Sequence, residues 1–202
     1  MRHSCFLLFL STVILFVQPV AGQKESELPF TPASFAVWSQ RMDMSAYIGK
    51  PYRLKVAIRT LPADADGLAT AFIRNEKPEG GLRAWVWMDN MMDRPVRDSV
   101  WKTYELNSIV EKKAPWIAFG VLSMSSGIYF FDDMHLEVAE KPGVWTELPI
   151  PNGDFEAVHL LPWQQTAQGV PIRVLGATAT LSTERPFAGK QCLRVENQFF
   201  GK

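Results

Sequence analysis

The chain has little of the side-chain chemistry by which most enzymes and metalloproteins are recognised from sequence. It contains two cysteines and three histidines, with no Gly-x-Ser-x-Gly motif and no Cys/His spacing of the kind that binds zinc. His135 lies in an alternating, strand-like run, where a histidine is more often a surface residue than a catalytic one. We therefore predict no catalytic residues and expect a protein that is not an enzyme.

Net charge is also absent, because Lys and Arg together number 21 and so do Asp and Glu. A neutral chain lacks the basic surface that attracts the phosphates of nucleic acids, and this chain has no polybasic stretch for anionic lipids. Beyond the N-terminus it has no run apolar enough to cross a membrane. We predict no nucleic-acid partner and no membrane insertion of the mature chain.

The N-terminus has the pattern of a secretory signal peptide. Residues 6–17 form an almost wholly apolar run after Arg2, and residues 19–22 supply the small side chains that signal peptidase needs. The apolar run is shorter than the roughly 20 residues of a membrane-spanning helix, although an uncleaved anchor is the alternative. We predict that residues 1–22 are a signal peptide and that the protein is exported, to the periplasm or outside the cell.

Cleavage of this peptide removes Cys5 and leaves Cys192 as the only cysteine. The mature chain then has no intrachain disulfide, although export would permit one. Cys192 stands in the alternating run QCLRVE, so we expect a buried, inert thiol.

Short runs of β-forming residues alternate with turn residues along the rest of the chain. Strand candidates lie at residues 52–59, 68–74, 82–88, 101–106, 116–122, 127–138, 155–163, 170–175, 177–182 and 191–196. No stretch combines a helical period with caps. We expect an all-β fold, a jelly-roll β-sandwich.

Two groups of motifs stand in this pattern. The first comprises MSAYIGKPYRL (44–54), NMMDRPV (90–96), WKTY (101–104), IAFG (117–120) and YFFDD (129–133). The second comprises NGDFE (152–156), PW (162–163) and FAGKQCLRV (187–195). The first group resembles galactose-binding-like jelly rolls, the fold of many carbohydrate-binding modules, and in particular accessory domains of exported bacterial proteins. Some of those precede C-terminal-processing-type serine peptidase domains. The second group resembles the first third of the same fold.

The resemblance implies an unusual order, because the segment that normally opens this fold follows the one that closes it. We favour a single sandwich with permuted strand order: signal peptide 1–22, linker or edge segment 23–37, and sandwich 38–202. The alternative is a partial sandwich over residues 38–138, followed by the start of a second, truncated module at 149–202.

Related jelly rolls often hold a structural calcium ion near the junction of these two groups. Asp132, Asp133 and Glu156 are the residues that the resemblance places there, with a carbonyl from the turn near Lys190. Ca²⁺ prefers six to eight oxygen ligands, which carboxylates and carbonyls supply. We therefore expect a possible calcium site; the alternative is a solvated acidic pair at a strand end.

Sugar binding requires an exposed aromatic platform with polar groups beside it, because ring faces stack on pyranoses and polar side chains bind hydroxyls. Trp85 and Trp87 share one strand face by the two-residue period. Their apolar neighbours favour the other interpretation, in which both rings point into the core. With the alternative platforms, the predicted ligand-binding residues are Trp85, Trp87, Asn90, Arg94, Trp145 and Trp163.

Together these features predict an exported, non-catalytic module that binds a carbohydrate or another extracellular polymer. The alternative is an accessory or interaction domain of an exported serine peptidase, in which the partner is a protein.

Overall fold

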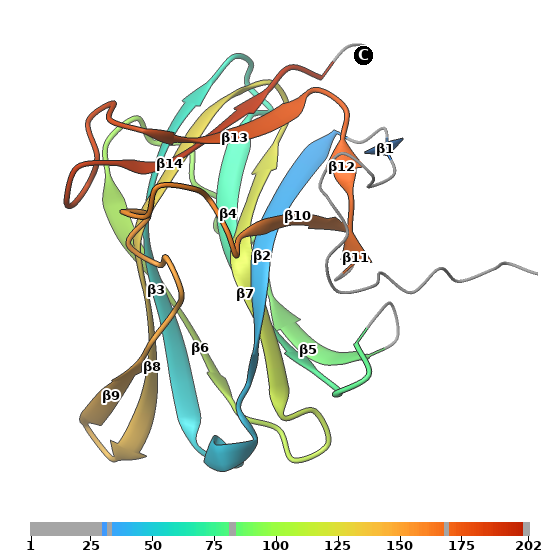
Figure 1. Cartoon of the computed structure of the whole chain (residues 1–202), viewed down its shortest axis with the longest axis vertical. Coiled ribbons are helices and arrows are strands. Elements are labelled where there is room, and N and C mark those ends of the chain that lie inside the picture. The colour runs from blue at the N-terminus through green and yellow to red at the C-terminus, as the bar shows by residue number, and fades with distance from the viewer. Residues whose placement is uncertain (1–29, 32–33, 81–83, 168–169, 200–202) are drawn as a thin grey trace, which may run out of the picture.

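The computed structural model describes residues 30–31, 34–80, 84–167 and 170–199, so the predicted signal peptide lies outside the described residues. The described residues form an all-β sandwich of two antiparallel sheets, as the sequence predicts (Figure 1). Within them there is no α-helix, only a single 3-10 turn at Ser45–Tyr47. A helix long and apolar enough to span a membrane is likewise absent from this part of the chain.

Sheet I runs in the order β11–β10–β2–β7–β4–β5. Its strands are β2 (Phe35–Asp43), β4 (Leu68–Glu76), β5 (Trp85–Asp89), β7 (Trp116–Met124), β10 (Gln164–Ala167) and β11 (Val170–Pro171). β5 is the last strand of this order and bends away from the body of the sandwich (Figure 1).

Sheet II runs in the order β13–β14–β8–β3–β6, with β9 also paired to β8. Its strands are β3 (Pro51–Pro62), β6 (Lys102–Ile109), β8 (Gly127–Lys141), β9 (Val144–Leu148), β13 (Ala177–Ser182) and β14 (Cys192–Asn197). The long strand β8 pairs with β14 over its first part and with β9 over its second. A short parallel pair joins β1 (Phe30–Thr31) to β12 (Arg173–Val174).

Alternating side chains explain why the sheets face one another. In β8, Leu136 and Val138 are fully buried, whereas His135 and Glu137, which alternate with them, are partly exposed. Successive residues of a strand point to opposite faces, so each strand offers one apolar face to the core.

The core also contains a polar link between the sheets. The hydroxyl of Tyr52 on β3 donates to Asn75 Oδ1 on β4 at 2.8 Å, and Asn75 Nδ2 donates to the carbonyl of Ile109 at 2.8 Å. Tyr52 and Asn75 are both fully buried, so these hydrogen bonds offset the cost of removing their polar groups from water.

The chain after residue 148 contributes strands to both sheets. β10 pairs with β2 in sheet I, and β14 pairs with β8 in sheet II. Asn197 on β14 also donates from Nδ2 to Ser123 Oγ on β7 at 2.9 Å, across the sandwich. The last third of the chain therefore belongs to the same two-sheet body as residues 38–138.

The predicted strand at 155–163 is wrong, because this segment is a loop. Asn152 and Phe155 have φ angles of 52° and 55°, in the left-handed region that strands do not use. The apolar residues that suggested a strand instead anchor the loop: the rings of Phe155 and Trp163 lie 5.4 Å apart and are buried.

Four strands have no counterpart in the sequence prediction: β1, β2, β9 and β10. β2 begins at Phe35, so residues 35–37, placed in a linker or edge segment from sequence, belong to a strand inside sheet I. In the predicted strand 82–88, Ala84 is in a turn, and β5 starts at Trp85.

Candidate functional site

Strand register in sheet I brings aromatic and charged side chains together on one face. In the first row across the sheet, Glu76 on β4 lies between Trp116 on β7 and Trp85 on β5. In the next row, Arg74 on β4 and Arg41 on β2 both lie opposite Ala118 of β7. Directly opposed residues in antiparallel strands have Cβ atoms about 5 Å apart and share a face. We call Arg41, Arg74, Glu76, Trp85 and Trp116 the Trp–Arg face.

The carboxylate of Glu76 is the centre of this face. Its side chain is only 1% exposed, and Arg41 Nε lies 2.7 Å from its Oε2, while Arg74 Nη2 pairs with its Oε1. A buried carboxylate requires partners of this kind, because removing an unpaired charge from water is costly. The two guanidinium groups are thus held in place by one buried acid.

Arg41 is held on several sides. Its guanidinium carbon lies 4.8 Å from the centroid of the Trp116 ring, and its Nη2 donates to the carbonyl of Lys77 at 3.3 Å. A Cβ atom at Gly80, whose φ is 65°, would approach Arg41 Nη1 to 3.2 Å. The backbone of this turn therefore lies close to the Arg41 guanidinium and limits the directions in which the side chain can point.

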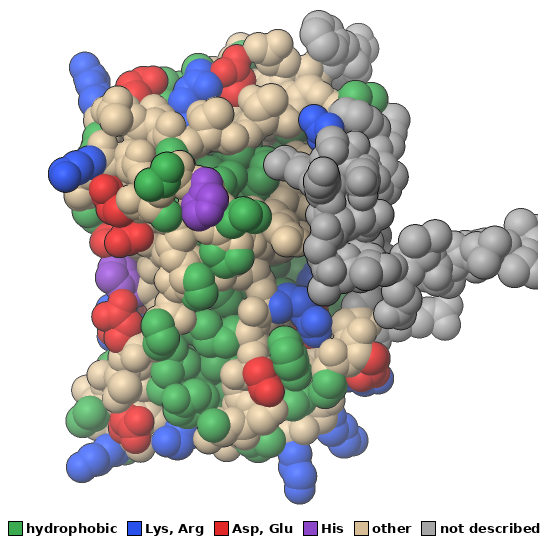
Figure 2. Space-filling view, in the orientation of Figure 1, with side chains coloured by type: hydrophobic (Ala, Val, Ile, Leu, Met, Phe, Trp, Pro, Cys, Tyr) green, Lys and Arg blue, Asp and Glu red, His purple; other side chains and the backbone are tan. Residues whose placement is uncertain are grey.

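Trp85 supplies an open aromatic ring beside these charges. It is 46% exposed, and Trp87 is 39% exposed, so the interpretation that both rings point into the core is wrong. On the side shown in Figure 2, basic, acidic and hydrophobic side chains lie close together over the region of β5.

The two rings do not form one platform. A bulge in the β4–β5 pairing places Trp85 opposite Glu76 and Trp87 opposite Asn75. Glu76 and Asn75 are successive residues of β4, so their side chains point to opposite faces. The two-residue period predicted a shared face, but the extra residue of a bulge shifts the alternation.

The turn after β5 uses the polar side chains that were predicted to bind ligand. Asn90 Oδ1 accepts from the backbone N–H of Met92 at 3.2 Å. Arg94 pairs through Nη2 with Asp89 at 2.5 Å and through Nη1 with Asp93 at 2.7 Å. Both residues shape the turn, and the Arg94 donors named here are already engaged.

Trp145 and Trp163 lie away from this face. Trp145 is on β9 of sheet II, half-buried, with the guanidinium carbon of Arg53 at 4.1 Å from its ring centroid. Trp163 is 2% exposed, and its Nε1 donates to the carbonyl of Asn152 at 2.8 Å. The prediction of Trp163 as a stacking platform is therefore wrong, because its ring fills the core.

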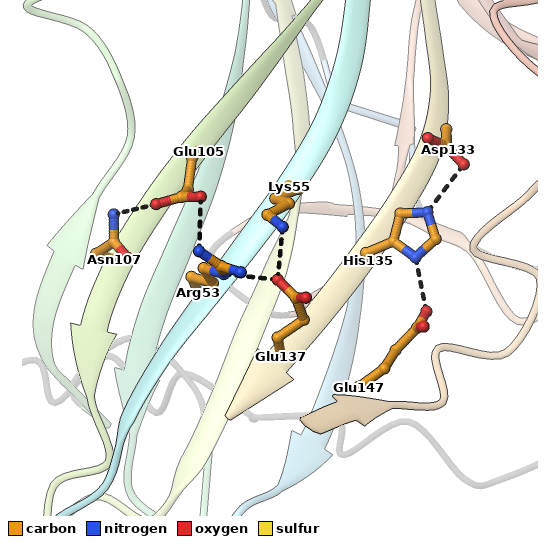
Figure 3. Close-up of polar contacts among 8 residues, drawn as sticks. All are labelled: Arg53, Lys55, Glu105, Asn107, Asp133, His135, Glu137 and Glu147. Atoms are coloured by element: carbon orange, nitrogen blue, oxygen red, sulfur yellow. Dashed lines mark hydrogen bonds and ion pairs between the residues drawn. The ribbon is translucent and has the colours of Figure 1, made fainter. Parts of the chain in front are cut away.

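The outer face of sheet II carries a network of paired charges (Figure 3). Glu137 Oε2 lies 2.6 Å from Arg53 Nε and 2.8 Å from Lys55 Nζ. Burial alone would raise the pKa of Glu137, but the hydrogen bonds from Arg53 and Lys55 outweigh it and lower the pKa. Arg53 also reaches Glu105 at 3.3 Å. These charges satisfy one another and leave little for a ligand.

His135 completes this network between two carboxylates, Asp133 on one side and Glu147 on β9 on the other (Figure 3). Its Nε2 lies 2.9 Å from Asp133 Oδ1, and its Nδ1 lies 2.6 Å from Glu147 Oε1. Partial burial would lower the pKa of His135, but the two acceptors outweigh it and raise the pKa. An imidazolium can donate from both nitrogens, which suits this position.

The predicted calcium ligands do not fit a calcium site. Asp132 Oδ2 accepts from the backbone N–H groups of Phe187 and Ala188, at 2.8 and 3.0 Å. Glu156 Oε1 accepts from those of Lys190 and Gln191, at 2.6 and 2.9 Å. Backbone N–H groups thus already bind one oxygen of each carboxylate.

Asp133 points elsewhere, toward His135, because a bulge and a φ of 51° turn it out of the regular strand. Across the described ranges, three His, Cys, Asp or Glu side chains do not converge in a way that could hold a metal. Asp132 and Glu156 do lie at the loop that contains Lys190, but they accept hydrogen bonds from its backbone N–H groups.

These two carboxylates respond differently to their surroundings. Burial raises the pKa of Asp132 and outweighs the backbone hydrogen bonds that would lower it. The backbone N–H groups of Gln191 and Lys190 lower the pKa of Glu156, which is exposed.

Cys192 is buried, as the sequence predicts, and burial raises the pKa of its thiol to about 12. The thiolate is the reactive form of cysteine, so this thiol is inert at neutral pH.

No protein-family model, curated protein or solved structure matches this chain. The resemblance to galactose-binding-like jelly rolls therefore depends on the sequence motifs, and the geometry must support any function directly.

Of the Trp–Arg face, sequence reasoning named Trp85 and did not name Arg41, Arg74, Glu76 or Trp116. Arg41 and Glu76 are 35 residues apart in the sequence. Their side chains meet because β2 and β4 both pair with β7. The sequence offered one signal for these residues. Arg74 and Glu76 are opposite charges two residues apart, at the end of an apolar strand candidate.

Proposed function

We propose that this protein is an exported, non-catalytic module that binds a carbohydrate or another extracellular polymer through the Trp–Arg face. The observation that carries the proposal is the row Trp116–Glu76–Trp85, with Arg41 and Arg74 in the row beside it. Aromatic rings stack on the apolar faces of pyranoses, and guanidinium and carboxylate groups bind their hydroxyls. Trp85 is exposed and Arg41 is partly exposed, so these two side chains of the face are accessible to a polymer.

The arrangement of the histidine and cysteine side chains supports a binding role over catalysis. His135 lies between two carboxylates, and in the described part of the chain no hydroxyl or thiol is hydrogen-bonded to its ring. The thiol of Cys192 is protonated and buried. A nucleophile needs a base within hydrogen-bond reach.

The experiment compares two tryptophans on the same strand in affinity electrophoresis against soluble polysaccharides and pull-down on insoluble glycans. We expect Trp85→Ala to weaken binding about tenfold, since one lost stacking contact is worth on the order of 1.4 kcal/mol. Trp87→Ala is the control and should bind as the wild type does, because Trp87 is also exposed but lies opposite Asn75. Loss of binding in Trp87→Ala alone, or no binding to any polymer, would contradict the proposal.

Export and fold type are part of the same proposal. We infer a galactose-binding-like sandwich with permuted strand order, which the insertion of β10 and β14 into the two sheets supports. The signal-peptide pattern of residues 1–22 supports export. N-terminal sequencing of the protein secreted by its host should begin at Gln23, and a mature chain that still starts at Met1 would refute cleavage.

A second candidate is a protein-interaction domain of an exported serine peptidase. The observation that favours it is the edge of β5, which pairs only with β4 among the described strands and carries exposed Val86 and Met88. Exposed, apolar edges accept an added strand from a partner. A peptidase-encoding frame continuous with Lys202, together with a complex that Val86→Lys abolishes, would favour this candidate over polymer binding.

A further inference from the structure

Guanidinium donors on the Trp–Arg face remain without acceptors among the described residues. Arg74 Nε is buried and has no hydrogen-bond partner in the part of the chain that the structure describes, and the Arg74 side chain is only 11% exposed. Arg41 donates from Nε and Nη2, and the contacts of the described residues include no acceptor for its Nη1. A buried donor without an acceptor is rare in folded proteins and marks a place that an incoming group can satisfy.

The geometry makes Arg41 a fixed donor. Its side chain is 30% exposed, so solvent reaches it, yet Glu76, the Trp116 ring and the Lys77 carbonyl hold the guanidinium in one orientation. A donor held in place loses little conformational entropy when a ligand binds. The acceptor that gains most from such a donor is an anionic one, because charge-assisted hydrogen bonds are roughly twice as strong as neutral ones.

The acidic groups nearby do not use these donors. Glu76 accepts from Arg41 Nε and pairs with Arg74 Nη2, which leaves Arg41 Nη1 and the Nε and Nη1 of Arg74 without an acceptor among the described residues. Asp43, which lies opposite Trp116 at the end of the first row, accepts from the N–H and hydroxyl of Ser45. Two guanidinium groups thus share one carboxylate at the centre of the face.

We propose that the ligand of this face is an anionic glycan whose sugar rings carry carboxylates, a polyuronate. This proposal rests on the proposed function and names its ligand class. The exposed ring of Trp85 stacks on a pyranose, and a uronate carboxylate on the same chain reaches the free donors of Arg41. An exposed ring on the same face as the guanidinium groups favours a sugar acid over an acidic peptide, whose side chains offer carboxylates without a pyranose face.

The test uses two polymers with the same backbone. The full-length mature protein is titrated against polygalacturonate and against its fully methyl-esterified form, in which the carboxylates are neutral. We expect at least tenfold tighter binding to polygalacturonate, with an affinity that falls as salt is raised. Arg41→Gln should remove this preference for the charged polymer. Arg94→Gln, whose arginine pairs with Asp89 and Asp93 outside the face, should keep both the preference and the binding to the ester.

The outcomes separate the two proposals. Equal or tighter binding to the ester, or an unchanged preference in a folded Arg41→Gln variant, overturns the polyuronate proposal and leaves polymer binding in place. Absence of binding to both polymers, to alginate and to neutral glycans overturns both proposals. If a thermal melt shows that Arg41→Gln does not fold, the comparison of the two polymers with the wild type decides whether the polyuronate proposal holds. Arg41→Lys then tests whether a positive charge alone is enough for the preference.

Discussion

At the scale of single residues, the positive charge of His135 contributes to the stability of the fold. Its pKa is raised in the folded protein by Glu147 and Asp133, against the effect of burial. Lys55 of β3 lies opposite it and is engaged with Glu137, so the two carboxylates are the acceptors that face the ring. The protonated ring can donate to both, and the neutral ring to only one.

The pH dependence of stability follows from this shift. A group with a raised folded pKa stabilises the fold fully below its unfolded pKa, about 6.5 for histidine, and this contribution is lost as pH rises through the folded pKa. We expect the melting temperature of the wild type to exceed that of His135→Gln by about 2–4 °C near pH 5.5, corresponding to about 1 kcal/mol for a partly exposed pair. The difference should vanish above pH 8.

Thermal melts across this pH range check the prediction. His159→Gln is the control, because His159 is exposed and no carboxylate is bonded to its ring among the contacts of the described residues. A difference between wild type and His135→Gln that grows with pH would mean that the neutral ring is the stabilising form.

Cys192 gives a second prediction at this scale. Because the pKa of its buried thiol is raised to about 12, we expect no reaction with a thiol reagent such as DTNB in the native protein at pH 8. One equivalent should react in the mature chain once denaturant unfolds it. Rapid reaction in the native state would show that the strand carrying Cys192 opens readily.

At the scale of elements, the loop between β13 and β14 is held by two acids from distant parts of the chain, Asp132 and Glu156. Asp132 accepts two of its backbone N–H groups, and Phe187 on this loop packs against Trp101 with ring centroids 6.0 Å apart. We expect Asp132→Ala to lower the free energy of unfolding by about 1–3 kcal/mol, because it leaves two N–H groups without an acceptor.

Denaturant titration measures this loss, and tryptophan fluorescence reports the neighbourhood of Trp101. Asp133→Ala is the matched control, since its carboxylate bonds His135 and not the loop. A chelator should leave the melting temperature unchanged. A large drop on chelation would restore the calcium site that the hydrogen bonds argue against.

Elements also show what can be derived from sequence. β3 and β8 were predicted because their apolar residues alternate and are bounded by turns, which is local information. β10 is the four residues QQTA, and nothing in their apolar content marks a strand; their pairing with β2 fixes them. The bulge at Trp85–Trp87 reversed the expected common face, since a single extra residue shifts the alternation.

The Trp–Arg face was beyond sequence reasoning for a related reason. Its members come from four strands, and only the sheet order β2–β7–β4–β5 makes them neighbours. Predicting Trp85 as a ligand-binding residue required only its type and its strand, whereas predicting Arg41 required the long-range pairing of β2 with β7.

At the scale of the whole molecule, the sandwich depends on both ends of the described chain. Without the residues after 148, β2 and β8 would each lose a paired strand, and the core would lose Phe155 and Trp163. The ring of Trp163 contacts that of Phe119 on β7, with centroids 6.1 Å apart, so the loop is packed into the sheet I side of the core. The segment after residue 148 therefore contributes both to the sheets and to the core of the sandwich.

We expect a mature chain that ends at Leu148 to be unable to fold, because it exposes two strand edges and an apolar face that aggregate readily. Trp163→Ala tests the same dependence without truncation and should cost about 3–5 kcal/mol, the usual loss for removing a large core aromatic. Trp145→Ala, at a half-buried position on β9, should cost much less. Circular dichroism and denaturant unfolding measure both effects, and a soluble truncated chain with a cooperative transition would show instead that residues 38–148 form an independent sandwich.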